Sequence, residues 1–91
     1  MNTNIKIPRY PVLIVEDKKE NQVLLQSLCS QLGVTTEVAE NGQIALDFVK
    51  SHKYSLFIVD LMLPVLDGKT FIESLKRIES SPVVIIQSAL D

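Results

Sequence analysis

The stretch Leu56-Phe57-Ile58-Val59-Asp60 is an apolar run that ends in an aspartate. A second run, Val12 to Val15, is equally apolar and is followed by Glu16-Asp17. Neither run alternates apolar and polar residues, which is typical of strands buried on both faces of a parallel sheet. Such strands end at one edge, where three carboxylates would repel each other unless a divalent cation lay among them. The sequence therefore predicts a metal site there, with Asp60 as a candidate nucleophile.

The rest of the chain alternates between strand and helix patterns. Helices are expected over residues 19–32, 43–51 and 69–79, and strands over residues 12–15, 35–39, 55–60 and 83–87. This alternation predicts βαβ units with right-handed crossovers, and so an α/β fold with a parallel sheet between two helical layers. Ligands of such sheets bind beyond the carboxyl ends of the strands. The residues expected at those ends are Glu16, Asp17, Asp60 and Ser88.

Several side chains carry local expectations. The first helix has an apolar stripe that includes Leu24, Leu25, Leu28 and Leu32, and Gly33 is expected to end it in a left-handed conformation. Asp17 is a candidate cap for that helix, in addition to its metal role. Asp67-Gly68 predicts a turn and a helix cap. The third helix is expected to bury four residues, namely Phe71, Ile72, Leu75 and Ile78.

Length and composition narrow the class of protein. The chain has 91 residues and is 46% hydrophobic, which indicates one globular domain. A net charge of −2 with no Lys/Arg cluster argues against nucleic-acid contact. No apolar run approaches the ~20 residues of a membrane span, and the N-terminus does not have the pattern of a secretory signal. The single cysteine, Cys29, fits a reducing, cytoplasmic compartment. Residues 1–10 are expected to form an arm before a domain spanning residues 11–91.

Four runs together carry a resemblance to a known family. They cover residues 13–17 (LIVED), 39–46 (AENGQIAL), 58–68 (IVDLMLPVLDG) and 82–89 (PVVIIQSA). In this order and spacing they resemble the receiver (response-regulator) domains of two-component signalling. The resemblance implies a flavodoxin-like fold with the strand order 2-1-3-4-5. Within the family, the run from Glu16 to Gln22 is most similar to receivers attached to hybrid sensor kinases.

The resemblance also implies a role for individual residues. Asp60 matches the phosphoacceptor, which takes a phosphoryl group from a phosphohistidine on a histidine kinase or a histidine phosphotransfer protein. Glu16 and Asp17 match the acidic pair that holds Mg²⁺ together with Asp60 and the backbone carbonyl of Met62. Ser88 matches a hydroxyl that turns toward the phosphoryl group. The backbone N–H of Ala89 matches a contact to a phosphoryl oxygen.

The C-terminal end departs from the family pattern. Receivers carry a fifth strand that ends in a lysine, and this chain stops after its expected fourth strand, over residues 83–87. The implied receiver is therefore incomplete at its C-terminus, without the last helix, strand and helix. Without that lysine, weaker phosphorylation is expected. The open apolar edge of the fourth strand predicts self-association, most simply a homodimer through this strand.

Three functions from different classes follow from these observations. The first is a signalling domain that is phosphorylated on Asp60 and is not an enzyme in its own right. The second is a receiver-like interaction or dimerisation module that no longer switches by phosphorylation. The third is a phosphatase of the aspartyl-phosphate type, which is disfavoured because Asp60-Leu61-Met62 has no second acid two residues after the aspartate.

Overall fold

A computed structural model describes residues 8–87 of the chain. The elements, in chain order, are β1 (Val12–Val15), α1 (Lys19–Gln31), β2 (Thr36–Ala39), α2 (Gly42–Ser51), β3 (Leu56–Asp60), α3 (Gly68–Ile78) and β4 (Val84–Gln87). Each expected helix and strand is present, and the boundaries differ from the predicted ones by a residue or so. The division into an arm over residues 1–10 and a domain from residue 11 stays a prediction.

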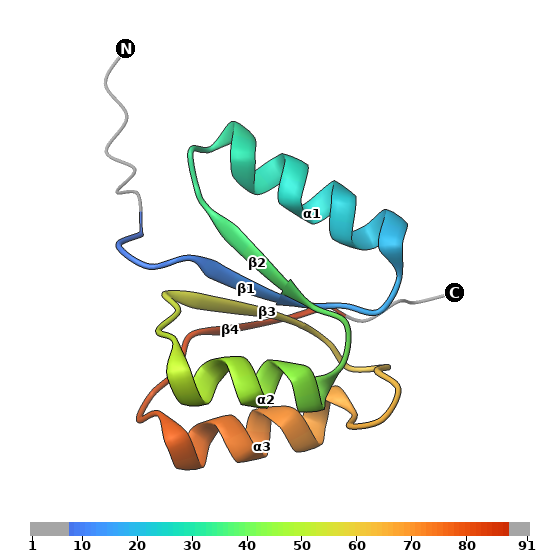
Figure 1. The fold of residues 1–91 in the computed structure, drawn as a ribbon, viewed down its shortest axis with the longest axis vertical. Coiled ribbons are helices and arrows are strands. Elements are labelled where there is room, and N and C mark those ends of the chain that lie inside the picture. The colour runs from blue at the N-terminus through green and yellow to red at the C-terminus, as the bar shows by residue number, and fades with distance from the viewer. Residues whose placement is uncertain (1–7, 88–91) are drawn as a thin grey trace.

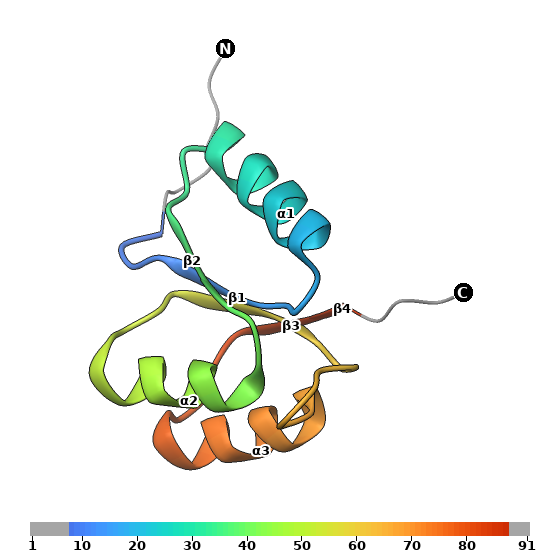
Figure 2. The same ribbon diagram turned by 45° about the vertical axis from the view of Figure 1, so that its right-hand side comes forward.

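The four strands form one parallel sheet in the order β2-β1-β3-β4. Helix α1 covers one face of the sheet, and α2 and α3 lie together on the other face (Figures 1 and 2). The predicted three-layer α/β architecture is confirmed. The order of the strands reverses on either side of β1, since β2 lies on one flank and β3 on the other. The carboxyl ends of β1 and β3 therefore form the switch point at which such sheets bind ligands.

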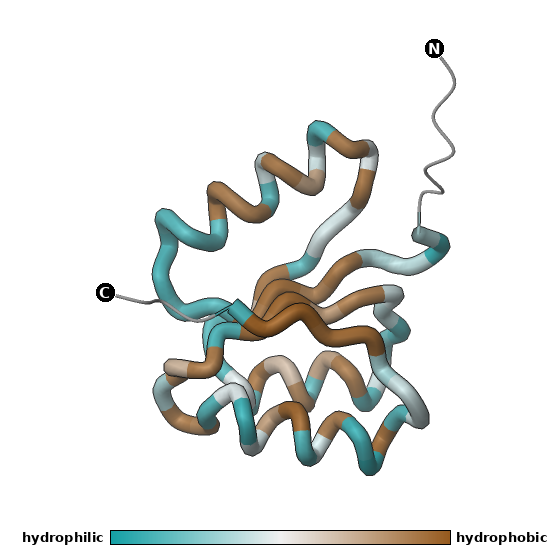
Figure 3. Tube along the Cα trace, turned by 180° about the vertical axis from the view of Figure 1, so that it is seen from behind, coloured by the Kyte–Doolittle hydropathy of each residue, from teal (hydrophilic) through white to brown (hydrophobic). Residues whose placement is uncertain are grey.

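The hydrophobic core lies between the sheet and the pair α2 and α3. All four residues of β1 are buried, as the unbroken apolar run predicts. In Figure 3 the strands form the continuous hydrophobic centre of the molecule, and the helices carry mixed faces. The core side chains on the α2 and α3 side include Leu13, Val15, Ala45, Val49, Tyr54, Phe57, Val59, Phe71 and Leu75.

Two glycines have local roles, one at the end of α1 and one beside the end of β3. Gly33 has φ 77°, so the predicted left-handed end of α1 is confirmed. Gly68 is required for a different reason, because a Cβ atom there would lie 2.4 Å from the carbonyl oxygen of Asp60. Asp67 Oδ1 accepts a hydrogen bond from the Thr70 amide at 2.8 Å and caps α3, as predicted. The start of α3 is thus packed directly against the end of β3.

Two local expectations are wrong. The N-cap residue of α1 is Lys18, whose side chain makes no capping hydrogen bond, so Asp17 does not cap this helix. Ile78, the last residue of α3, is 44% exposed, so it is not buried as expected. The apolar stripe of α1 is also open to solvent, with no fully buried residue in the helix. Three of its members, Leu24, Leu28 and the following Leu32, are about half exposed.

Among residues 8–87, no helix has the length and apolar character needed to cross a membrane.

Candidate metal centre

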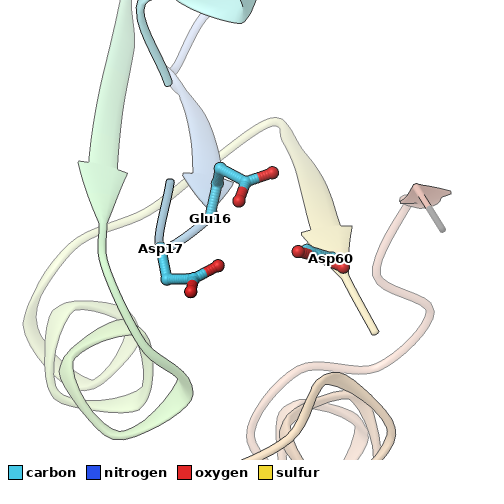
Figure 4. Close-up of side chains that lie close together, drawn as sticks. All are labelled: Glu16, Asp17 and Asp60. Carbon is cyan, nitrogen blue, oxygen red and sulfur yellow. The ribbon is translucent and has the colours of Figure 1, made fainter. Parts of the chain in front are cut away.

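Three carboxylates meet at the carboxyl ends of β1 and β3. Glu16 and Asp17 directly follow β1, and Asp60 is the last residue of β3. One ligand oxygen from each residue lies within 4.8 Å of those of the other two. Figure 4 shows Glu16 and Asp17 extending from the end of β1 on the side where Asp60 lies. The predicted meeting of the three carboxylates is confirmed.

Glu16 is held by contacts to the start of α1. Its Oε2 accepts a hydrogen bond from the Lys18 backbone amide at 3.0 Å, and its Oε1 accepts one from Asn21 Nδ2 at 3.4 Å. Gln22 Nε2 donates to the Glu16 carbonyl oxygen at 2.7 Å. These contacts fix a carboxylate that is only 1% exposed. The helical pattern of the sequence contains Asn21 and Gln22 but gives no sign of this role.

Asp60 is held by the loop that follows β3. Its Oδ1 accepts a hydrogen bond from the Met62 backbone amide at 2.9 Å, and its side chain is 7% exposed. The Gly68 amide donates to the Leu61 carbonyl at 3.3 Å, which ties the next residue to the start of α3. Met62 therefore contacts the Asp60 side chain through the Met62 backbone N–H.

The electrostatics of the cluster favour a cation. Burial raises the pKa of Glu16 above its usual value, and the hydrogen bond from the Lys18 amide lowers it. The charge of Asp60 then raises the Glu16 pKa again. Two buried carboxylates and an exposed third, Asp17, thus form a set of anionic oxygens in a small space. Mg²⁺ and Ca²⁺ bind such oxygen ligands, and Mg²⁺ commonly uses one or two carboxylates with several waters.

The other predicted site residues have different outcomes. The Met62 N–H contacts Asp60 and its side chain is 74% exposed, whereas the ligand role of its carbonyl stays a prediction. Ser88 and Ala89 lie outside the described residues. Sequence reasoning also missed Gln87, the last residue of β4 and the partner of Asp60 in the sheet register. A polar residue at the end of an otherwise apolar strand was the only available signal.

Comparison with known proteins identifies the family. The sequence model of the response regulator receiver domain matches residues 12–91. Histidine kinase 5 of Arabidopsis thaliana is 40% identical over 67 residues, which is 72% of this chain and 7% of the kinase. The transcriptional activator protein IrlR of Burkholderia pseudomallei is 34% identical over 80 residues, which is 88% of this chain and 35% of IrlR. The chain thus spans only a small part of the kinase and about a third of IrlR.

Solved structures agree with the sequence comparison. The receiver domain of the Francisella response regulator 1452 has a TM-score of 0.83 and 31% identity, over 91% of this chain and 69% of that one. The response regulator TrrA of Thermotoga maritima, solved in complex with Mg²⁺ and a beryllium fluoride, has a TM-score of 0.85 and 26% identity. That match covers 89% of this chain and 70% of TrrA. This chain belongs to the response regulator receiver domain family of two-component signalling.

Proposed function

We propose that this domain is a phosphoacceptor that takes a phosphoryl group onto Asp60 in a Mg²⁺-dependent reaction. The observation that carries the proposal is the approach of three carboxylate oxygens to within 4.8 Å at the switch point of a receiver fold. The proposal is supported by the similarity of this chain to TrrA, which was solved in complex with Mg²⁺ and a beryllium fluoride. The role is that of a signalling module and not of an enzyme with small-molecule turnover.

The chain supplies hard oxygen ligands suited to Mg²⁺. In the proposed site Glu16, Asp17 and Asp60 would hold the ion, directly or through water, together with the backbone carbonyl of Met62. When bound, the ion supplies positive charge that screens the repulsion between Asp60 and an anionic phosphoryl donor. The buried Glu16 is positioned by α1, so the site is already assembled before a donor arrives.

The Asp60 carboxylate has two oxygens with different roles in the proposal. Oδ1 accepts the hydrogen bond from the Met62 amide, which fixes the plane of the carboxylate. Oδ2 then attacks the phosphorus atom of a phosphohistidine. The new bond is Oδ2–P, the bond that breaks is N–P, and the imidazole leaves and takes up a proton from water. Such transfers depend on positioning and charge neutralisation more than on covalent chemistry by the protein.

The donor and the response complete the proposal. The donor is a phosphohistidine on a histidine kinase or on a histidine phosphotransfer protein, in line with the likeness to Histidine kinase 5. Phosphorylation adds almost two negative charges at the end of β3. The Ser88 hydroxyl and the Ala89 N–H would donate hydrogen bonds to the phosphoryl oxygens, as the family resemblance implies.

An intact-mass measurement tests the proposal. The protein is incubated with a small phosphodonor, such as acetyl phosphate, in the presence of Mg²⁺ or of a chelator. We expect one phosphoryl adduct with Mg²⁺, its loss in Asp60→Asn, and its retention in the control Asp47→Asn, since Asp47 is exposed on α2. An adduct that persists in Asp60→Asn contradicts the assignment, and steady release of phosphate from many small esters would indicate a phosphatase.

A second candidate function is an interaction module that associates through β4 and does not switch by phosphorylation. The observation that favours it is the position of β4 at the edge of the sheet formed by residues 8–87. Three apolar side chains in this strand or directly before it are at least half exposed, namely Val83, Ile85 and Ile86. Mg²⁺ binding without any phosphoryl adduct would favour this function over the first.

A further inference from the structure

Gln87 is the polar residue that ends the apolar strand β4. It is the Cα partner of Asp60 in the parallel register, and its carbonyl accepts a hydrogen bond from the Leu61 amide at 3.3 Å. Adjacent strands of a sheet lie about 4.8 Å apart. Gln87 therefore lies one strand away from the proposed phosphoacceptor, on the flank opposite to β1.

The register also places the Gln87 and Asp60 side chains on the same face of the sheet. Paired residues of parallel strands point the same way, and successive residues alternate between the two faces. Val59 and Val84 pack against the core formed with α2 and α3. Asp60 and Gln87 are offset from them by an odd number of residues, so both side chains leave the sheet on the other side. Glu16 follows Val15, the partner of Val59, and extends the same row.

The amide oxygen of Gln87 is buried and has no hydrogen-bond partner within the described part of the chain. An unpaired buried acceptor costs about 1–3 kcal/mol, and proteins rarely keep one without a reason. The missing partner must be a donor. The carboxylates of Asp60 and Glu16 are acceptors only, whereas a water molecule polarised by a divalent cation is a strong donor.

We propose that Gln87 is a positioning residue of the Asp60 site: its Oε1 accepts a hydrogen bond from water that Mg²⁺ holds beside Asp60. Mg²⁺ usually retains several waters when a protein binds it, and each of them needs an acceptor. Gln87 orients one of these waters from the β4 flank, as Asn21 and the Lys18 amide orient Glu16 from the α1 flank. The inference rests on the proposed magnesium site and adds a residue to it.

The test compares Mg²⁺ affinity in four proteins by calorimetry: the parent, Gln87→Met, Gln87→Glu and Ile86→Met. Gln87→Met has a similar length and shape but no acceptor, so we expect about three- to tenfold weaker Mg²⁺ binding, the value of one hydrogen bond. Gln87→Glu keeps an acceptor at the same reach and should bind at least as tightly as the parent. Ile86→Met changes the neighbouring residue, which is 55% exposed on the other face, and should leave the affinity unchanged.

Thermal denaturation of the same proteins separates a role at the metal from a purely structural one. Without Mg²⁺, Gln87→Met should be as stable as the parent or more so, because the unpaired acceptor is gone. Saturating Mg²⁺ should raise the melting temperature of the parent more than that of Gln87→Met. A shift of equal size in both contradicts the inference.

The calorimetric outcomes distinguish this inference from the proposed function. Parent and Gln87→Met affinities within 1.5-fold of each other would overturn the role of Gln87 and leave the metal site intact. Equal weakening in Gln87→Met and Ile86→Met would also overturn it, since general damage to β4 would then explain the loss. A parent protein that does not bind Mg²⁺ would refute the metal site itself, and the inference with it.

Discussion

At the scale of single residues, the site combines good positioning with unfavourable electrostatics. Asp60 and Glu16 are both buried, and the charge of Asp60 contributes to the raised pKa of Glu16. Asp60→Asn removes one charge and keeps an Oδ1 atom for the Met62 amide. We therefore expect this variant to be about 1 kcal/mol more stable than the parent without divalent ions.

Urea denaturation in the presence of a chelator measures this difference. Asp47→Asn is the control, because it removes an exposed carboxylate of α2 that is not part of the cluster and should leave the stability unchanged. The order should reverse with Mg²⁺, which stabilises the parent by binding and leaves Asp60→Asn almost unaffected. A loss of stability in Asp60→Asn without metal would show that the cluster is not under repulsion.

Tyr54 should make the folding stability depend on pH in the alkaline range. Its hydroxyl donates to Glu37 Oε1 at 2.6 Å, and burial, followed by this hydrogen bond, raises its pKa well above the usual value. The folded protein thus keeps a proton that the unfolded chain loses near pH 10. Folding stability should be fully present below that pH and fall as the pH rises above it.

Melting temperatures between pH 8 and 11 check this expectation. Tyr54→Phe should be about 1 kcal/mol less stable at pH 8, because Glu37 loses its donor, and should lose less of its remaining stability above pH 10. Tyr10→Phe, which changes the only other tyrosine of the sequence, should keep the steep fall of the parent. Identical slopes in all three proteins would exclude Tyr54 as the cause.

The sequence made the acidic residues of the site predictable but not their surroundings. Glu16, Asp17 and Asp60 follow apolar runs, and parallel strands necessarily end at one edge. The contacts of Asn21, the close approach at Gly68 and the position of Gln87 depend on how α1, α3 and β4 dock on the sheet. Local patterns carry no information on that docking.

At the scale of elements, α2 illustrates how a single cap positions a core helix. Asn41 Oδ1 accepts a hydrogen bond from the Ile44 amide at 2.9 Å, and the helix that follows buries Ala45 and Val49. Asn41→Ala should cost about 1 kcal/mol of stability, the usual value of a lost cap. The control Gln43→Ala, at an exposed position of the same turn, should change it by less than half as much in the same urea denaturation. Equal losses would mean that the cap is not the cause.

Element boundaries were predictable because periodicity and turn residues act locally. Whether another element packs against the apolar face of a helix could not be predicted in this way. The leucines of α1 repeat as they would on a buried face, yet Leu24 and Leu28 are about half exposed. Ile78 fits the apolar spacing of α3 but is its last residue, and it is 44% exposed. Periodicity indicates which residues share a face and leaves open whether another element lies against it.

At the scale of the whole molecule, β4 forms one edge of the sheet within residues 8–87, and its Ile85 and Ile86 are 50% and 55% exposed. Such an edge pairs readily with another strand. We expect the protein to self-associate, with an average mass in light scattering that rises with concentration. Ile85→Lys should reduce the association, whereas Val23→Lys, on α1, should not. A mass that stays monomeric over the whole range would contradict a homodimer through β4.

The central claim is that Glu16, Asp17 and Asp60 together bind one divalent cation. Calorimetric titration of the protein with Mg²⁺ at neutral pH tests it most directly, beside the single variants Glu16→Gln, Asp17→Asn and Asp60→Asn and the control Asp47→Asn. The account predicts one site in the parent, at least tenfold weaker binding in each of the three variants, and no change in the control. Absence of binding in the parent, or an affinity that none of the three variants alters, would contradict it.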